Sequence, residues 1–398
     1  MISSEDATKI VLENTLQLTT ERVPLAHALG RLLAEDLIAD RDFPPYDRVA
    51  MDGIAIQYTA FAKGQRQFPV EGVAAAGSPQ KVLQSAESCM EIMTGAVLCK
   101  GADTIIRYED VSIEDGIATI TVEEIKQGQN VHNKGLDRKA GSIIISKGNT
   151  ITPAEIGVAA TVGKPELVVK ALPSVVILSS GDELVEINQT PLPHQIRKSN
   201  VYSIQAILQG WGIAADTAHL IDDQVQIEQQ LQELVANYDI LVMSGGVSKG
   251  KYDFIPAALE KVGIQKLFHR VRQRPGKPFW FGKGERGTVV FALPGNPVSS
   301  FMCTMRYLQA FLRKSQGLAP FAEKHAILTE NVLFKPDLTY FMQVKLSYTK
   351  EGTLLASPTH GYGSGDLANL TQTDAFMELP TGQQEFKKGS IYPIFPYR

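Results

Sequence analysis

Two short stretches decide the fold class: residues 174–183, which read SVVILSSGDE, and residues 239–246, which read DILVMSGG. Each is a continuous apolar run that ends in serine and glycine, which is typical of a buried parallel strand followed by a turn. Helix-type patterns follow these runs, over residues 200–210, 224–236 and 254–262. Short strands that alternate with helices predict βαβ units, so we expect an α/β fold with a doubly wound parallel sheet over residues 174–320.

The segments on either side of this region have β-type patterns. Residues 46–139 are rich in Ile, Val, Thr and Tyr, show no strong helix pattern and contain Asp115-Gly116 as a hairpin turn. Residues 325–398 alternate in the same way, with Lys350-Glu351-Gly352 between two strands. The predicted parts are an elongated N-terminal linking domain (residues 1–45 and 140–173), a β-rich inserted domain (46–139), the α/β domain (174–320) and a C-terminal β-domain (321–398).

Two helices are expected near the N-terminus. The first covers residues 3–18, with Ser4 as its N-cap. The second is short and runs from Leu25 to Leu33, where leucines recur at roughly helical spacing. Two prolines in residues 42–47, which read DFPPYD, then force an extended chain and mark the first domain boundary.

The composition is that of an ordinary globular protein. Of 398 residues, 44% are hydrophobic and 21% charged, which excludes a disordered or fibrous chain. A net charge of −4 excludes a strongly basic nucleic-acid footprint but leaves room for a local anion site. The three cysteines lack the spacing of a disulfide framework or zinc site. With no leader pattern and no apolar run of about 18 residues, we expect a soluble cytoplasmic protein without nucleic-acid or membrane partners.

Three loops follow strands of the predicted α/β domain, where open α/β sheets bind ligands. Residues 179–183 carry two adjacent carboxylates that could hold Mg²⁺ near a phosphate, or could form a polar turn with a capping acid. Residues 244–253, which read SGGVSKGKYD, could turn backbone N–H groups toward an anion, or form a simple strand-to-helix turn. Asp253 could cap the next helix or bind a metal.

The third loop, residues 293–300, reads LPGNPVSS. Asn296-Pro297 begins a helix expected over residues 297–314, and the free N–H groups of its first turn could cradle an oxyanion together with Ser299 and Ser300. Upstream, residues 270–278 read RVRQRPGKP and place four cations within eight residues. A solvated charged face is the alternative to positioned cations. The combination favours a phosphorylated or otherwise anionic small ligand, and the lack of Walker and GxGxxG motifs excludes ordinary NTPases and dinucleotide enzymes.

The order of these motifs resembles the molybdopterin molybdotransferase family, which is related to the E domain of gephyrin. The resemblance covers nearly the whole chain and rests on PPYD leading to AMDG at residues 44–53, IMTGA at 92–96, SGDEL at 180–184, SGGVS at 244–248, PGKP at 275–278 and LPGNPVS at 293–299. It implies insertion of molybdate into the dithiolene of adenylylated molybdopterin, with Mg²⁺-dependent release of AMP. It also implies an elongated homodimer, in which the pterin-binding domain of one subunit faces the 46–139 region of the other.

The resemblance also implies site residues, motif by motif. The catalytic group is Asp52, Thr94, Asp137, Glu183, Asp222 and Asp253, with Glu183 and Asp253 as metal ligands. The molybdopterin and phosphate group is Ser244, Gly245, Gly246, Ser248, Pro294, Gly295, Asn296 and Pro297. The molybdate group is Arg274, Lys277, Ser299 and Ser364.

The chain departs from the family pattern at several positions. Arg48-Val49 stands where Asn-Ser is usual, Ile54 replaces a tyrosine, and Arg270 and Arg274 replace lysines. The C-terminal β-domain of the family usually offers an arginine, whereas residues 338–343 read LTYFMQ here. One expected molybdate contact is therefore missing.

Two other functions compete with this one. A molybdopterin adenylyltransferase uses the same kind of α/β domain but usually lacks the Met-Asp-Gly region and the C-terminal β-domain. A non-catalytic dimeric scaffold is the second alternative, and the acids at positions 52, 183 and 253 argue against it. The partners that the resemblance implies are a pterin adenylyltransferase and molybdoenzyme acceptors.

Overall fold

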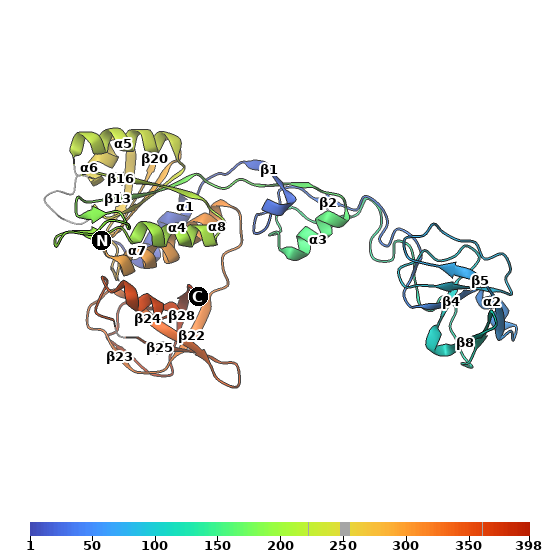
Figure 1. Ribbon diagram of the computed structural model, residues 1–398. Coiled ribbons are helices and arrows are strands. Elements are labelled where there is room, and N and C mark those ends of the chain that lie inside the picture. The colour runs from blue at the N-terminus through green and yellow to red at the C-terminus, as the bar shows by residue number, and fades with distance from the viewer. Residues whose placement is uncertain (222, 247–254, 360) are drawn as a thin grey trace. The chain divides into compact units, whose positions relative to one another are not determined.

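The computed structural model describes residues 1–221, 223–246, 255–359 and 361–398. These residues divide into two compact units, drawn in Figure 1. The first unit is Met1–Glu21, Gly30–Leu32 and Val169–Arg398, and the second is Arg22–Leu29 and Leu33–Val168. Within the described residues, no helix combines the length and the apolar character that crossing a membrane requires.

The first unit contains a six-stranded sheet of mixed direction. Its strands, in spatial order, are β16 (Ala215–Leu220), β13 (Val175–Ser180), β17 (Ile240–Ser244), β21 (Val289–Leu293), β20 (Trp280–Gly284) and β18 (Ile264–His269). The first four run parallel, as predicted. β20 is antiparallel to both β21 and β18, so the sheet is not wholly parallel. The short links before and after β20 explain this, because a parallel crossover needs a dozen or more residues.

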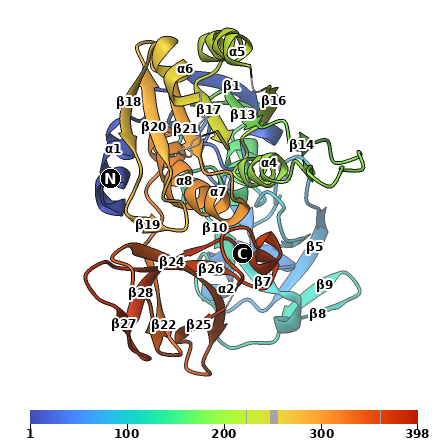
Figure 2. The ribbon, with the colours of Figure 1, turned by 90° about the vertical axis from the view of Figure 1, so that its left-hand side faces the viewer.

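Helices cover both faces of this sheet (Figures 1 and 2). Successive strand residues point to opposite faces, so Val175 and Ile177 pack on one side while Val176 and Leu178 pack on the other. The first side holds α1 (Ser4–Glu13), α4 (Asn200–Gly210), α7 (Pro297–Cys303) and α8 (Gln309–Ser315). The second side holds α5 (Gln224–Asn237) and α6 (Ile255–Lys261). Burial on both faces accounts for the continuous apolar runs of the sequence.

Two helix predictions need correction here. The cap of α1 is Ser3, whose hydroxyl accepts the Asp6 N–H at 3.0 Å, and not Ser4. Ser4 is fully buried and its hydroxyl lies 3.0 Å from that of Thr339, because the start of α1 packs against a distant strand. The helix expected over residues 297–314 is interrupted by a π-helical turn, η3 (Thr304–Leu308), between α7 and α8.

The end of the chain forms a closed barrel. Its strands, in spatial order, are β24 (Thr339–Tyr348), β25 (Leu354–Pro358), β22 (Lys324–Leu328), β28 (Ile391–Pro396) and β26 (Ala375–Leu379), and β26 pairs with β24 again. β24 and β25 are the two strands predicted around residues 350–352. A short strand, β23 (Val332–Leu333), pairs with β27 (Glu385–Phe386).

One strand joins the barrel to the α/β sheet. β19 (Gln273–Arg274) belongs to the connection between β18 and β20, and it pairs in parallel with the first residues of β24. The Thr339 N–H also donates to the Arg272 carbonyl at 2.9 Å. The cationic stretch of the sequence is therefore held against the edge of the barrel.

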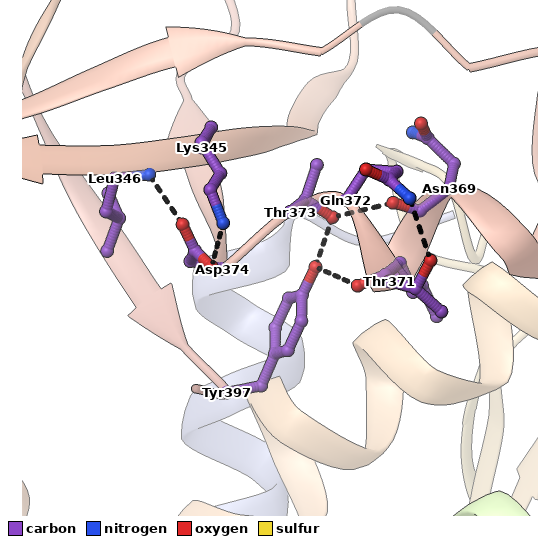
Figure 3. Close-up of polar contacts among 9 residues, drawn as sticks. Lys345, Leu346, Asn369, Thr371, Gln372, Thr373, Asp374 and Tyr397 are labelled. Carbon is purple, nitrogen blue, oxygen red and sulfur yellow. Dashed lines mark hydrogen bonds and ion pairs between the residues drawn. The ribbon is translucent and has the colours of Figure 1, made fainter.

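Polar contacts fix the segment that follows the Ser364 loop (Figure 3). This segment is the 3₁₀ turn η4 (Leu367–Thr371). The Tyr397 hydroxyl contacts the Thr373 hydroxyl and donates to the Leu370 carbonyl at 3.4 Å. Asp374 accepts hydrogen bonds from Lys345 Nζ and from the Leu346 N–H, both at 2.9 Å. These contacts tie η4 to the barrel and so limit the freedom of the loop before it.

The second unit contains another six-stranded sheet. Its strands, in spatial order, are β7 (Thr104–Arg107), β4 (Gly53–Ile56), β6 (Cys89–Ile92), β5 (Gln67–Ala74), β9 (Ile117–Ile120) and β8 (Val111–Glu114). Asp115-Gly116 makes the predicted hairpin between β8 and β9, with φ of 49° and 77°. A short helix, α2 (Tyr58–Ala62), interrupts the region where no helix was expected.

The remaining elements are small. α3 (Pro153–Thr161) begins with a capping box formed by Thr152 and Glu155. Short strand pairs join β2 (Leu37–Ile38) to β11 (Ile143–Ile145), β3 (Arg48–Val49) to β10 (Val131–His132), β1 (Thr20–Pro24) to β12 (Glu166–Lys170) and β14 (Leu184–Val185) to β15 (Ile196–Arg197).

The helix predicted from Leu25 to Leu33 is wrong. Only the 3₁₀ turn η1 (Leu25–His27) forms there. The Leu25 N–H donates to the Pro165 carbonyl at 2.8 Å and the Leu33 N–H to the Asn149 carbonyl at 2.9 Å. These partners far along the chain replace the hydrogen bonds within a helix.

Candidate active site

A pocket of about 1180 Å³ lies in the first unit at the carboxyl ends of β13, β17 and β21. Ser179, Ser244 and Pro294 line it from the ends of these strands. The barrel supplies another wall through β24 and the loop of residues 361–365. This is the edge at which open α/β sheets bind their ligands, and the sequence placed the three polar loops there.

The predicted residues that the structure brings together in this pocket come from all three groups. They are Glu183, Ser244, Gly245, Gly246, Arg274, Lys277, Pro294, Gly295, Asn296, Pro297, Ser299 and Ser364. Asp222, Ser248 and Asp253 lie outside the described residues. Asp52, Thr94 and Asp137 belong to the second unit.

Hydrogen bonds hold the serine-glycine loop against the loop after β21. The Gly245 N–H donates to the Leu293 carbonyl at 3.2 Å. Asn200, the first residue of α4, donates from Nδ2 to the Ser244 hydroxyl at 2.8 Å and to the Gly295 carbonyl at 2.7 Å. Gly246 has a φ of 69°, and a Cβ there would lie 2.9 Å from the Ser180 hydroxyl. Glycine therefore allows this loop to approach β13.

The four cations of residues 270–278 separate in the structure. Arg274 and Lys277 line the pocket and are exposed, and neither forms a hydrogen bond or ion pair through its side chain with another described residue. The Arg274 guanidinium lies 5.9 Å from the centre of the Phe334 ring. Arg272 instead pairs with Asp337, and Arg270 does not line the pocket. Two of the four cations thus line the pocket without an ion pair to a described acidic residue.

The start of α7 differs from the oxyanion cradle that the sequence suggested. Asn296 occupies the N-cap position, but its side chain donates to the Ser364 hydroxyl at 2.8 Å instead of capping the helix. The Val298 N–H is also taken, since it donates to the Ser364 carbonyl at 3.1 Å. Ser299 is 3% exposed and lines the pocket. The barrel loop therefore occupies part of the predicted cradle and brings Ser364 into the pocket.

Glu183 is the acid that lines the pocket among the described residues. Its side chain is exposed and lies close over Gly181, which has a φ of 121°. No group of three or more His, Cys, Asp or Glu side chains with metal-binding geometry occurs in the described part of the chain. One carboxylate beside an open pocket still fits Mg²⁺, which is usually bound through one or two carboxylates together with substrate phosphates and water.

Asp52 and Thr94 contact each other in the second unit. Asp52 Oδ1 accepts the Thr94 N–H at 2.6 Å and the Thr94 hydroxyl at 2.8 Å. These two bonds, the backbone one first, lower the pKa of the Asp52 carboxyl. Asp137 instead lies 2.9 Å from His132 Nε2 through its Oδ1. Asp52 is thus held as a carboxylate at neutral pH.

Other pocket residues were missed from the sequence. They are Asn200, Arg197, Lys198, Tyr340, Gln343 and Tyr362. Tyr340 stacks on Phe334 with ring centres 4.2 Å apart, and burial raises the pKa of its hydroxyl. Leu338 lines the pocket at the position where the family usually has arginine, so β24 contributes no cation to this wall. The alternation of residues along a strand could have assigned Tyr340 to one face of its sheet. It could not have predicted that Tyr340 lies in a pocket with the loops of the α/β sheet.

A histidine lies behind the first loop. Ser179, which is 3% exposed, has its hydroxyl 2.9 Å from His219 Nδ1. Burial is the main cause that lowers the pKa of His219, and the charge of Lys198 adds to it. The pocket therefore has a neutral imidazole behind its serine wall at neutral pH.

Fold and pocket together define a multidomain α/β protein with a pocket lined by cations and glycine-rich loops at the ends of its parallel strands. Three family models match the chain: the MoeA N-terminal region (domain I and II) over residues 2–163, a probable molybdopterin binding domain over residues 176–314, and the MoeA C-terminal region (domain IV) over residues 325–396. Together they span most of both units.

Full-length relatives agree with these matches. The chain is 39% identical to a protein of Synechocystis sp. named molybdopterin molybdenumtransferase, with 100% of both chains covered. It is 34% identical to a protein of the same name from Synechococcus elongatus, with 98% of both covered. The crystal structure of a molybdopterin biosynthesis MoeA protein from Pyrococcus horikoshii is similar over 100% of both chains, with a TM-score of 0.82 and 26% identity. The chain belongs to the molybdopterin molybdenumtransferase family.

Proposed function

We propose that this protein inserts molybdate into the dithiolene of adenylylated molybdopterin, with Mg²⁺-dependent release of AMP. Membership of the family makes the chain a transferase of molybdenum cofactor biosynthesis. The observation that carries the finer proposal is the pocket at the strand ends, where the Arg274 and Lys277 side chains form no hydrogen bond or ion pair with the described residues and lie beside glycine-rich loops and Glu183.

The loops after β17 and β21 suit the phosphate end of the pterin substrate. Backbone N–H groups and hydroxyls can donate to phosphate oxygens without bringing a fixed charge. Asn200 holds these loops together, since its amide bonds to both Ser244 and Gly295. In this proposal the loops bind and orient the substrate, and orientation supplies a large share of the rate.

Molybdate is a dianion that needs cations or many donors to leave water. Arg274 and Lys277 provide the charge, while Ser299 and Ser364 provide hydroxyl donors at the start of α7 and in the barrel loop. Leu338, which precedes β24, stands where the family usually has an arginine. Among these proposed ligands, the positive charge therefore comes from the β18–β20 connection alone. The Tyr340 hydroxyl is a further neutral donor in the same wall.

Glu183 and Asp253 would hold Mg²⁺ in this proposal, with Asp253 outside the described residues. When bound, the ion would neutralise charge on the phosphoanhydride that is cleaved. The protein side chains would hold the substrate so that AMP leaves as molybdate enters the dithiolene, and the pocket would stabilise the charge that develops.

We further propose a cytoplasmic homodimer with the four domains predicted above. In it, the second copy would supply Asp52, Thr94 and Asp137 to complete the pocket. Two hydrogen bonds from Thr94 hold the Asp52 carboxylate in the second unit, which supports a shared role of these two residues. A pterin adenylyltransferase would deliver the substrate, and molybdoenzymes would accept the product.

Two assays on the purified protein separate the candidate functions. With adenylylated molybdopterin, Mg²⁺ and molybdate, we expect release of AMP and formation of molybdenum cofactor. With molybdopterin and ATP, an adenylyltransferase would produce adenylylated pterin, and we expect none. A pure scaffold would be inactive in both assays.

A further inference from the structure

We propose that Gln273 is a positioning residue: its buried amide fixes the loop that carries Arg274 and Lys277, and the Tyr307 hydroxyl fixes the amide. The inference rests on the proposed function, because it assigns the two cations to molybdate. It adds two fully buried residues, Gln273 and Tyr307, to the proposed site.

The hydrogen-bond network of Gln273 and Tyr307 is buried and contacts the loop of residues 274–277. Gln273 and Tyr307 are both 0% exposed. Gln273 donates from Nε2 to the carbonyl of Gly276 at 2.9 Å. Gly276 is the residue before Lys277. The Tyr307 hydroxyl donates to Oε1 of the same amide. Both ends of the glutamine side chain are therefore engaged, and its rotation is blocked.

The loop has little space in which to move. Gly276 has a φ of 90°, and a Cβ there would lie 2.8 Å from Cys303 Sγ, 2.8 Å from Gln273 Nε2 and 2.9 Å from Met302 Cε. The loop ends are also fixed, because the Val271 N–H donates to the Lys277 carbonyl at 3.0 Å and Arg274 pairs with Tyr340 of β24. Glycine is required at this close approach to α7.

The positions of the Arg274 and Lys277 side chains depend on how the backbone that carries them is held. Neither Arg274 nor Lys277 has a side-chain hydrogen bond or ion pair with a described residue that could hold it in place. Apart from the Phe334 ring, which lies 5.9 Å from the Arg274 guanidinium, their positions depend on the backbone of residues 274–277. The Gly276 carbonyl is the point where the fully buried amide of Gln273 holds that backbone.

A purely structural role explains this network poorly. Burying an amide and a phenol costs free energy unless both are hydrogen-bonded, and well-packed apolar side chains of similar size would avoid that cost. Tyr307 lies in the π-helical turn η3, and such turns occur frequently at functional sites. Burial also keeps the pKa of Tyr307 well above its ordinary value, so the hydroxyl remains a donor at neutral pH.

The test compares four proteins: wild type, Gln273→Met, the double variant Gln273→Met with Tyr307→Phe, and the control Phe311→Leu. The double variant removes both polar groups, so its unfolding temperature should exceed that of Gln273→Met, in which the Tyr307 hydroxyl loses its acceptor. Phe311 is fully buried in α8 and packs on Phe281 and Phe291, so its substitution destabilises the same unit without touching the network.

The readouts are the molybdate and the adenylylated pterin needed for half-maximal AMP release, together with the unfolding temperature. In the double variant we expect the molybdate needed for half-maximal AMP release to rise about tenfold, which corresponds to the loss of roughly one hydrogen bond. The pterin requirement should change little. Phe311→Leu should leave both requirements near wild type. An unchanged molybdate requirement in an active double variant, or an equal rise in Phe311→Leu, would overturn the inference. Absence of AMP release from wild type would instead reject the proposed function itself.

Discussion

Asn296 Nδ2 donates a hydrogen bond to the Ser364 hydroxyl at 2.8 Å, and this contact joins the loop after β21 to the loop before η4. The Ser364 carbonyl accepts a second bond from the Val298 N–H at 3.1 Å. The two contacts place a barrel residue at the start of α7. The α/β sheet and the barrel therefore build one pocket together.

The Asn296–Ser364 contact predicts energetic coupling between these residues. Asn296→Ala and Ser364→Ala should each raise the molybdate needed for AMP release, and the double variant should cost less than the sum of the two. We expect a coupling of about 1 kcal/mol, the usual net value of one hydrogen bond. A double-mutant cycle on kcat/KM measures it, with the exposed Ser347→Ala as control. Strict additivity would show that the contact does not contribute to the site.

The free cations predict a selective loss of molybdate use. Arg274→Ala and Lys277→Ala should each weaken it by roughly 1.5–3 kcal/mol, the range for hydrogen bonds to charged groups, while pterin binding is spared. Titrating molybdate and pterin separately distinguishes the two effects. Lys350→Ala, an exposed lysine in the turn after β24, is the matched control. A rise confined to the pterin requirement would reassign both cations to the substrate phosphate.

Glu183 should be needed for the reaction and dispensable for folding. Its carboxylate is exposed, lines the pocket and has no hydrogen bond to another described residue, so Glu183→Gln should leave the unfolding temperature unchanged. AMP release at saturating Mg²⁺ should fall strongly, and Asp253→Ala should behave alike. Glu285→Gln, at an exposed turn between β20 and β21, serves as control. If both pocket variants kept near wild-type AMP release, the metal assignment would be wrong.

The proposed homodimer predicts complementation between two inactive chains. Asp52→Ala and Glu183→Ala damage different units of the chain, so a mixed dimer would carry one intact composite pocket. Mixing the two proteins should restore part of the wild-type AMP release. Mass spectrometry of the mixture confirms that subunits have exchanged. No recovery after confirmed exchange would favour a pocket built within one chain.

His219 predicts a pH dependence of stability. Burial lowers its pKa in the folded chain below the ordinary value of 6.5. Above that pH both states are neutral, and as the pH falls through it only the unfolded chain takes up the proton. Stability should therefore fall with decreasing pH until the lower folded pKa is reached.

Urea unfolding at a series of pH values between about 5 and 7 tests this expectation. His219→Gln should flatten the decline in the free energy of unfolding over that range. His194→Gln, at an exposed position, should leave the decline as in wild type. An unchanged slope in His219→Gln would remove His219 as its cause.

The sequence predicts the α/β sheet where burial leaves a strong pattern. Residues 175–178 and 240–243 are apolar throughout because helices cover both faces of their strands. The sequence does not predict the antiparallel direction of β20. That direction depends on the short connection between β18 and β20, part of which pairs with the barrel. The leucines of residues 25–33 suggested a helix, but hydrogen bonds to Pro165 and Asn149 decide their backbone.

The site follows a similar division. Clustered glycines and serines after strands identified the loops at residues 179–183, 244–253 and 293–300, and described residues of all three line one pocket. Asn200 looked like an ordinary helix start, although its amide connects two of these loops. The pairing of β19 with β24 positions Tyr340 and Gln273 at the pocket, and no local sequence pattern predicts this pairing.

The proposed reaction is tested most directly by measuring AMP released from adenylylated molybdopterin by the wild-type protein, with Mg²⁺ and molybdate each either added or withheld. We expect release that depends on both Mg²⁺ and molybdate, with molybdenum recovered in the pterin product in proportion to the AMP formed. Release of AMP at the same rate without molybdate, or incorporation of molybdenum without AMP, would contradict it.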